Sequence, residues 1–588
     1  MNSKSLRNWN LMIQASTSNG FFSESLNLYS SMLKTNTHGD NFTFPFVAKA
    51  CARLNSISDG KKIHAHTILL GFHSDPYVQT SLLDMYSKCS NLESASRVFD
   101  EMPARTLVSW NSMISAYTRK CQVKRSFEVF NEMRRVGIEP DSSTLVSLVS
   151  GCPGSELALQ YGLVMQCYGI KVGFDSGLCF VNSVMGMYVR YGMVDAACSL
   201  FKLMEERSKV TWTTIMSGYL RNGDCSKVFD LFSEMRRDHI ELDSLVFINL
   251  ISSCALLANI QIASSVHALL VKHALDHEPM VAATVVNLYS KCGDLLLARK
   301  VFDSINEKDV SLWTSMIGGC VLNGNSTEAM DIFELFLRSP IKPNAVTIVT
   351  ILSACIGFGS LTLGESVREY AKENGLESDL RVQTSLIDMY CKCGCIEKAK
   401  EIFNRVQVKD LALWSAMING YAHHGEGKEA LALFKELEKE ETIKPDAIVF
   451  TSVLSGCSHG GLVEEGLECF ERMQRDYRIE PRVEHYSCVI DLLGRAGHFD
   501  LALNLIRPLP VEAQRHVWGP LLNGSRPHHN GELCAIFESE QETSGNYVLM
   551  ANIQASLGNW KEVTKYRRLM DKKGLIKKTG WSRIDSGA

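Results

Sequence analysis

The chain has 588 residues, of which 45% are hydrophobic and 21% are charged. These fractions are ordinary for a folded protein and exclude a fully disordered chain, a collagen-like fibre and a mucin-like stalk. The 61 Lys and Arg residues face 65 Asp and Glu residues, and this balance excludes a global basic field of the kind that polybasic proteins use to hold phosphate.

Patterned sequence begins close to the first residue. Residues 1–5 form a short leader, and neither an apolar signal stretch nor a long Arg- and Ser-rich presequence precedes Trp9. No presequence is visible in this chain, and its start does not reveal where the protein is targeted.

The chain repeats itself with a period of about 101 residues. Two residue types mark this period at intervals of 101 or 102: tryptophans at Trp9, Trp110, Trp212, Trp313 and Trp414, and cysteines at Cys51, Cys152, Cys254, Cys355 and Cys457. Such regular self-similarity is typical of repeat architectures and decides the fold class.

Each period divides into three similar segments, which in the second period are residues 107–141, 142–177 and 178–208. Apolar residues of the first segment follow helical spacing in two runs: Trp110, Met113, Ile114 and Tyr117, then Phe127, Phe130 and Met133. Gly137 and Pro140 end the second helix. Because one helical hairpin of this length cannot bury its own apolar stripe, the hairpins must stack, and the sequence predicts an all-α fold, an α-solenoid of helix-turn-helix repeats.

Three strings carry a family resemblance: VSWNSMI at 108–114, IHAH at 63–66 and LDMYSKC at 83–89. They resemble the P, L and S repeats of the pentatricopeptide repeat (PPR) family, PLS subclass. The resemblance implies a right-handed superhelix of fifteen repeats, arranged in P-L-S triplets at 6–106, 107–208, 209–309, 310–410 and 411–513.

Residues 514–588 resemble the E region that follows such arrays. The matching strings are VWGPLL at 517–522, SGNYVLMANI at 544–553 and KGLIKK at 573–578. The first E motif is expected to be shortened between Glu532 and Ser544 and to lack its long helix. No DYW cytidine-deaminase domain is expected to follow.

Family members of this kind are plant organellar RNA-binding proteins, mostly site-recognition factors for C-to-U editing. The resemblance implies that the fifth and the last residue of a repeat contact one RNA base. In the P repeats the pairs are Asn10/Asp40, Asn111/Asp141, Thr213/Asp243, Thr314/Asn344 and Ser415/Asp446. In the S repeats they are Asn182/Ser208 and Thr384/Asp410, with weaker pairs at Thr80/Thr106 and Ala283/Asp309.

The base code familiar from the family assigns U to Asn/Asp, G to Thr/Asp, A to Thr/Asn and C to Asn/Ser. With the N-terminus at the 5′ end, it implies U at repeat one, U-x-C-G at repeats four to seven and A-x-G at repeats ten to twelve. The alternative interpretation is that the last residue only caps the next helix, since Asp, Asn and Ser are good N-caps. Capping does not explain the polar fifth residue.

Basic residues gather near the C-terminus, against only two acids between 561 and 583. These basic residues are Lys561, Lys565, Arg567, Arg568, Lys572, Lys573, Lys577 and Lys578. They favour docking of RNA phosphate or of a partner protein, and the alternative interpretation is a helix face that is simply solvated.

The sequence offers no catalytic site. A zinc deaminase needs His-x-Glu and Pro-Cys-x-x-Cys, and no two of the 19 cysteines lie three residues apart. His239-Ile240-Glu241 occupies a turn between repeats, and Cys391, Cys393 and Cys395 are interpreted as structural because Cys393 is equivalent to the lone Cys89. We expect no enzyme activity, catalytic residue, metal or cofactor.

The expected function is therefore sequence-specific binding of single-stranded organellar RNA and recruitment of a DYW-type deaminase in trans. No membrane and no small-molecule substrate is expected, and family frequency favours the mitochondrion over the chloroplast. Two alternatives remain: an RNA-binding protein that stabilises, splices or activates a transcript without editing, and a helical-repeat scaffold that binds proteins.

Overall fold

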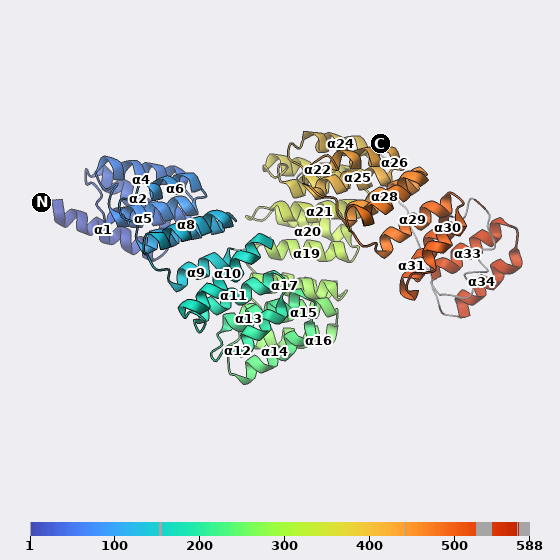
Figure 1. Ribbon diagram of the computed structural model, residues 1–588, viewed down its shortest axis with the longest axis horizontal. Helices are drawn as coiled ribbons and strands as arrows, with labels where there is room; N and C mark the ends of the chain where they lie inside the picture. Colours follow the sequence, from blue (N-terminus) through green and yellow to red (C-terminus); the bar gives the residue numbers. More distant parts are fainter. Residues whose placement is uncertain are drawn as a thin grey trace. The chain divides into compact units, whose positions relative to one another are not determined.

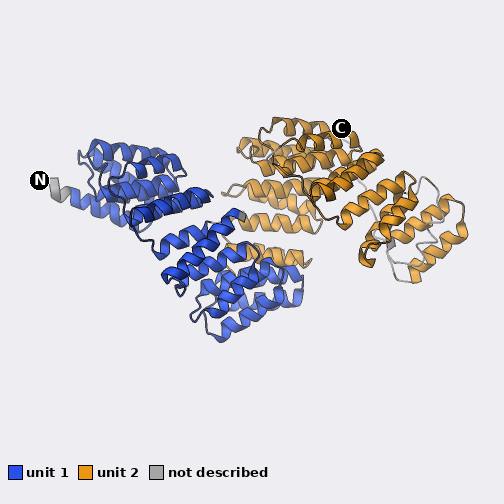
Figure 2. Cartoon of the chain, in the orientation of Figure 1, with its two compact units in different colours: residues 1–275 blue, residues 276–588 orange. Residues whose placement is uncertain are grey.

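The computed structural model describes residues 2–151, 156–440, 443–524, 528, 544–572 and 574, and these residues form 33 helices and no strand (Figure 1). The chain divides into two compact units, residues 1–275 and residues 276–588 (Figure 2). The division falls between the second and third repeats of the expected triplet 209–309. The all-helical solenoid predicted from the repeats is confirmed.

The first unit contains α1 to α16, most of them 9 to 14 residues long. Their bounds are α1 Asn2–Ser18, α2 Phe22–Lys34, α3 Thr43–Leu54, α4 Ile57–Leu69, α5 Pro76–Lys88, α6 Leu92–Asp100, α7 Leu107–Arg119, α8 Val123–Arg135, α9 Ser142–Ser150, α10 Glu156–Val172, α11 Leu178–Arg190, α12 Val194–Leu203, α13 Lys209–Arg221, α14 Cys225–Arg237, α15 Ser244–Leu257 and α16 Ile260–Lys272.

The second unit contains α17 to α31, α33 and α34. Their bounds are α17 Pro279–Lys291, α18 Leu295–Ser304, α19 Val310–Leu322, α20 Ser326–Leu337, α21 Ala345–Phe358, α22 Leu361–Glu373, α23 Leu380–Lys392, α24 Ile396–Arg405, α25 Leu411–His423, α26 Gly427–Leu437, α27 Ala447–Gly460, α28 Val463–Arg475, α29 Val483–Arg495, α30 Phe499–Ile506, α31 Val511–Gly524, α33 Ser544–Ser556 and α34 Trp560–Lys572.

Within each unit the helices form hairpins that stack in one direction. The first helix of a repeat packs on its own second helix and on the first helices of both neighbours, as α7 packs on α8, α5 and α9. A second helix also packs on the next first helix, as α6 packs on α7. The first helices therefore form a continuous inner layer, which places their N-terminal turns side by side.

One aromatic junction recurs in every period and explains the spacing of the tryptophans. In each, a Phe from the second helix of an S repeat meets the Trp of the next first helix edge-on, with ring centroids 4.9 to 5.0 Å apart: Phe99–Trp110, Phe201–Trp212, Phe302–Trp313 and Phe403–Trp414. A cation covers each Phe ring at 4.5 to 4.9 Å: Arg105, Arg207, Lys308 and Lys409. Edge-to-face pairs and cation–π contacts stabilise a junction beyond simple burial.

Short turns separate the helices, and the predicted stop after the second helix is observed. Helix α8 ends at Arg135, and Gly137 adopts a φ of +81° that residues with a side chain rarely tolerate. The chain then extends through Pro140 to Asp141, which begins the next inner helix. This turn delivers the last residue of a repeat to the N-terminus of the next first helix.

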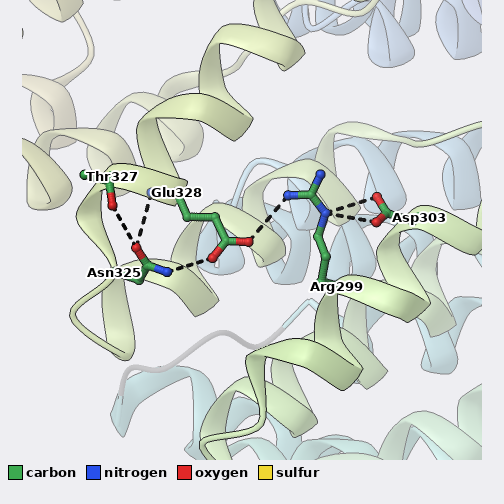
Figure 3. A network of polar contacts seen from close by, with 5 residues as sticks. All are labelled: Arg299, Asp303, Asn325, Thr327 and Glu328. Atoms are coloured by element: carbon green, nitrogen blue, oxygen red, sulfur yellow. Dashed lines mark hydrogen bonds and ion pairs between the residues drawn. The ribbon is translucent and has the colours of Figure 1, made fainter.

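Polar side chains link second helices of neighbouring repeats, as Figure 3 shows for α18 and α20. Arg299 on α18 contacts Asp303 at 3.0 Å and reaches Glu328 of α20 at 3.5 Å. Asn325 caps α20 by accepting from the Glu328 backbone N–H, and it also accepts from the Thr327 hydroxyl. Partly exposed ion pairs contribute little to stability, so the stacking rests on the apolar layer.

Among the described residues, none of the helices has the length and hydropathy needed to span a bilayer. The segment between Glu532 and Ser544, where a shortened E motif was expected, lies outside the described residues.

Candidate nucleic-acid interface

The last residue of each predicted pair lies at the start of an inner helix, as its N-cap in every case but Asp40, which precedes Phe42, the N-cap of α3, by two positions. Six of them accept the backbone N–H of the third residue of that helix through their side chains: Asp141, Asp243, Asp309, Asn344, Asp410 and Asp446. Ser208 and Thr106 cap α13 and α7 in the same way, and Asp40 accepts from the backbone N–H groups of Phe42 and Thr43. Capping therefore accounts for the residue type at the last position.

Capping does not account for the fifth residue, which in repeat four contacts the last residue directly. Asn111 lies on α7 and donates through Nδ2 to Asp141 Oδ1 at 3.0 Å and to Ser143 Oγ at 2.8 Å. Its Oδ1 accepts from the Thr144 hydroxyl at 2.6 Å. Both ends of the amide are thus held by groups at the start of the next repeat.

Repeat one repeats this arrangement. Asn10 donates to Asp40 Oδ1 at 2.9 Å, and the Thr43 hydroxyl donates to Asn10 Oδ1 at 2.6 Å. Repeat six is looser, since Asn182 Nδ2 lies 3.4 Å from Ser208 Oγ and Asn182 Oδ1 is buried without a hydrogen-bond partner. The structure thus brings together all three pairs that have Asn in the fifth position.

Pairs with Thr in the fifth position are not directly bonded. In repeat ten the Thr314 hydroxyl donates to the Val310 carbonyl of its own helix at 2.7 Å and lies 2.8 Å from Thr347 Oγ1. Thr347 Oγ1 in turn lies 3.2 Å from Asn344 Oδ1. The hydroxyls of Thr213 and Thr384 likewise donate to backbone carbonyls of their own helices, at 3.0 Å and 2.9 Å, and the Thr213 side chain is buried.

The weaker predicted positions differ in polarity. Thr80 donates to the Pro76 carbonyl of its own helix, and Ala283 is buried and offers no polar atom. Of the P-repeat pair Ser415/Asp446, Ser415 lies half-buried on α25 and Asp446 caps α27.

Two open grooves contain these positions, one in each unit. The groove of the first unit has a volume of about 420 Å³ and is lined by Asn111 and Asp141 together with Lys88 and Arg119. The groove of the second unit has a volume of about 820 Å³ and is lined by Thr314, Asn344 and Asp309, among others. The predicted pairs are therefore accessible from solvent at these repeats.

Asp141 is ionised in this setting. Burial by itself would raise the pKa of its carboxyl group, but hydrogen bonds from Thr144, Ser143 and Asn111 outweigh burial and lower the pKa below its ordinary value. An ionised carboxylate accepts hydrogen bonds and donates none, so it orients the Asn111 amide with Nδ2 toward itself.

Apolar residues beside the pairs were not singled out from the sequence. Three positions before the fifth residue, on the first turn of the inner helix, many repeats expose a large apolar side chain: Phe42, Tyr77, Val108, Val210, Leu245, Met280, Val346 and Ile448. Val108 and Val346 line the two grooves. The sequence does carry a signal for them, because each is an apolar residue that does not fit the helical spacing of the buried face. Exposed apolar residues of this kind suit contact with the faces of unstacked bases.

The predicted basic cluster is partly described. Lys561, Lys565, Arg567, Arg568 and Lys572 are exposed on α34, whose Val563 and Tyr566 are buried. Helix α34 packs on α33, so the hairpin presents the basic residues to solvent. Lys573, Lys577 and Lys578 lie outside the described residues.

Cys391 lies in the packed interior, and His64 lies at a helix–helix contact. Burial raises the pKa of Cys391 to about 12, which keeps it a thiol at neutral pH. His64 lies 2.9 Å from the Tyr86 hydroxyl, across the packing of α4 on α5. Among the described residues no group of three or more His, Cys, Asp or Glu side chains could hold a metal ion.

Comparisons with known proteins follow the same repeats. A model of the PPR repeat family matches residues 105–153, 207–255 and 409–459. A model of the single PPR repeat matches residues 7–36, 80–106, 180–208, 283–310, 311–341, 384–411, 448–477 and 484–507. An E motif model matches residues 532–585.

The solved structures and curated relatives that match this chain include pentatricopeptide repeat proteins. The crystal structure of the pentatricopeptide repeat protein PPR10 in complex with an 18-nt psaJ RNA element aligns with a TM-score of 0.51 at 15% identity, over 97% of this chain and 95% of that one, and shares the fold. Pentatricopeptide repeat-containing protein At1g15510, chloroplastic, of Arabidopsis thaliana is 36% identical over 100% of this chain and 68% of its own length. Protein At4g19191, mitochondrial, of the same plant is 34% identical over 99% of this chain and 90% of its own length. The chain therefore belongs to the pentatricopeptide repeat family and carries an E motif.

Proposed function

We propose that this protein binds single-stranded RNA of a plant organelle base by base and selects sites for C-to-U editing, with the deaminase supplied in trans. The observation that carries the proposal is the recurrence of short polar side chains at the fifth and last positions, of which Asn111/Asp141 and Thr314/Asn344 line an open groove, one in each unit. The RNA-bound PPR10 structure, which has the same fold, supports the same use of the repeats.

Base recognition follows from the chemistry of the pairs. Unstacked bases expose Watson–Crick edges that amide and hydroxyl groups can hydrogen-bond, whereas a duplex hides those edges. The pairs Asn111/Asp141, Thr213/Asp243 and Thr314/Asn344 offer different donors and acceptors, so each favours a different base. The proposed target carries U-x-C-G opposite repeats four to seven and A-x-G opposite repeats ten to twelve.

The E motif supports the editing role. Residues 532–585 match the E motif, and α33 and α34 form a hairpin with an exposed basic face. We assign this face, which includes Lys565 and Arg568, to docking of RNA phosphate or of the deaminase partner. The last S repeat, at residues 483–513, is expected four nucleotides upstream of the edited C.

The compartment belongs to the proposal. The plant relatives include proteins named chloroplastic and proteins named mitochondrial. We propose a plant organelle and favour the mitochondrion.

The test compares C-to-U editing across all organellar transcripts in plants with and without this protein. The expected result is loss of editing at a few sites whose upstream bases fit the pairs, in one organelle. A chain that ends at residue 513 is the matched control, because it keeps the repeats and should bind the RNA without restoring editing. Unchanged editing together with altered transcript abundance or splicing would instead establish an RNA-binding protein that acts without a deaminase.

A further inference from the structure

A buried hydroxyl accompanies the base-contact pair in some repeats and is replaced by an apolar side chain in others. The position is the third residue after the last residue of a repeat. Thr43, Thr144 and Thr347 occupy it after repeats one, four and ten, and all three side chains are fully buried. Val246, Leu413 and Val449, which occupy it after repeats seven, twelve and thirteen, are also fully buried. Because burying a hydroxyl is unfavourable unless it is hydrogen-bonded, these threonines require a specific role.

Capping explains one part of that role. The backbone N–H of Asp141 donates to Thr144 Oγ1 at 3.2 Å, and the backbone N–H of Thr144 donates to Asp141 Oδ1 at 2.8 Å, which completes a capping box for α9. This arrangement uses the oxygen of the hydroxyl as an acceptor. It leaves the hydroxyl hydrogen for another partner.

The hydrogen of each threonine lies within reach of the fifth residue of the preceding repeat. The Thr144 hydroxyl is 2.6 Å from Asn111 Oδ1, the Thr43 hydroxyl is 2.6 Å from Asn10 Oδ1 and the Thr347 hydroxyl is 2.8 Å from Thr314 Oγ1. For Thr144 the other acceptor in reach is Asp141 Oδ1, at 2.7 Å.

These contacts fix which atoms the fifth residue can present. With Oδ1 against the Thr144 hydroxyl and Nδ2 against the Asp141 carboxylate, the Asn111 amide has one favourable orientation. A flipped amide would place two acceptors, Asn111 Oδ1 and the Asp141 carboxylate, against each other. Thr213 and Thr314 both donate to carbonyls of their own helices, but only Thr314 has a threonine hydroxyl, that of Thr347, from which it can also accept. Val246 offers Thr213 no such donor.

Repeat six marks the boundary of the arrangement. Thr211 is buried there too, but its hydroxyl contacts Ser208 at 3.1 Å, and Asn182 Oδ1 has no hydrogen-bond partner. In this repeat, therefore, the Thr211 hydroxyl bonds to the shorter cap residue Ser208 and does not orient Asn182.

We propose that Thr43, Thr144 and Thr347 are positioning residues that orient the fifth residue of the preceding repeat, so that base selectivity depends on three residues where they occur. The inference rests on the proposed RNA recognition. It predicts that an Asn/Asp pair selects its base strongly only when a threonine follows the Asp by three residues.

The experiment transplants the arrangement into repeat seven, which has Thr213, Asp243 and Val246. Full-length wild-type protein, Thr213→Asn and the double variant Thr213→Asn/Val246→Thr are each titrated with four RNAs. These RNAs carry the proposed target and differ only in the base opposite repeat seven. Thr213→Asn should move the preference from G toward U, and Val246→Thr should sharpen the U preference by a further three- to tenfold, about the effect of one hydrogen bond.

The converse variants act on repeat four with the base opposite it varied. Thr144→Val, which conserves volume, should reduce discrimination by a similar factor, whereas Thr144→Ser keeps the hydroxyl and should retain it. Ratios among the four RNAs are unaffected by the folded fraction, because any loss of folded protein weakens all four equally. A role in capping alone would therefore leave the ratios unchanged.

The outcomes separate the two proposals. The positioning role would be overturned, while base recognition stands, by either of two results. One is that Thr213→Asn and Thr213→Asn/Val246→Thr give the same ratios of dissociation constants among the four RNAs. The other is that Thr144→Val discriminates among the four RNAs as well as the wild type does. Wild-type protein that binds all four RNAs equally, or binds none, would overturn the proposed function itself.

Discussion

The groove of the first unit and the groove of the second unit use the same helix positions with different chemistry. The first combines an Asn/Asp pair with Arg119 and with Lys88, whose ammonium group is paired with Asp84 at 2.6 Å. The second combines Thr314 and Asn344 with Asn287 and Asp309, and no Lys or Arg is among its lining residues. On the proposed function we expect Arg119 to add phosphate attraction in the first groove, and hydrogen bonding and contact with base faces to dominate in the second.

Both grooves depend on the stacking of the repeats behind them, so the largest expected effects come from the apolar layer. Phe130 on α8 and Phe434 on α26 are buried at equivalent places in the two units. Phe130→Ala and Phe434→Ala should each lower the free energy of unfolding of their own unit by about 3–5 kcal/mol. Hydrogen exchange measured by mass spectrometry should show faster exchange in repeats next to the substitution.

Localised damage is the distinguishing feature, since contacts in a solenoid join neighbouring repeats only. Each variant serves as the control for the other. If Phe130→Ala accelerated exchange throughout residues 276–588, the expectation of localised damage would be wrong.

The base-contact pairs give the next largest effect. Asn111→Thr in the first groove and Asn344→Asp in the second both create a Thr/Asp pair, so both should shift the preferred base to G, from U and from A respectively. We expect a change in selectivity of about tenfold for each, the size of one good base contact. Competition binding with RNAs altered at one nucleotide measures it.

Asp in place of Asn344 can still cap α21, so this substitution leaves the helix N-terminus intact. A loss of affinity for all four bases without a shift toward G would show that the pair stabilises the fold and does not select the base.

Charge is the third point of comparison. Arg119→Gln should weaken binding to every RNA sequence alike and reduce the steepness of the dependence of log Kd on log salt by about 0.7, the value for one phosphate contact on a single strand. Leu322→Gln in the second groove is the matched control and should leave the salt dependence unchanged. Dissociation constants measured at several salt concentrations test both, and equal slopes for Arg119→Gln and wild type would contradict a phosphate contact.

The sequence predicted the repeat architecture well because each hairpin is specified locally. Evenly spaced apolar residues, Gly137 and Pro140 set the helices, and the recurring Trp–Phe junction sets the period. Within the site, the sequence pointed to the fifth and last positions, whose contact with RNA stays a prediction, but to neither the buried Thr144 nor the exposed Val108. Their roles depend on contacts between repeats, and a Thr among apolar residues has no distinct periodic signal. The two-unit division at residue 275 has no compositional marker in the chain.

The smallest expected effect concerns the cap residues Asp141 and Asn344, which hold equivalent places in the two grooves. The lowered pKa of Asp141 means that its ionised form is stabilised in the folded state, so its contribution is present at neutral pH. That contribution is lost as the pH falls from the ordinary range of an Asp side chain through the lowered pKa of the folded state. Asn344 has no ionisable side chain and its cap should persist. The loss at α9 should be about 1 kcal/mol, the usual value of a cap.

Hydrogen exchange of the first turn of α9, compared with that of α21 between neutral and acidic pH, measures this difference after correction for the intrinsic pH dependence of exchange. Asp141→Asn is the control, because it keeps a capping side chain and removes the titration. Its α9 protection should follow that of α21 across the whole range. If wild-type α9 also followed α21, ionisation of Asp141 would not be what holds the start of that helix, and the Asn111 amide would need another reason for its orientation.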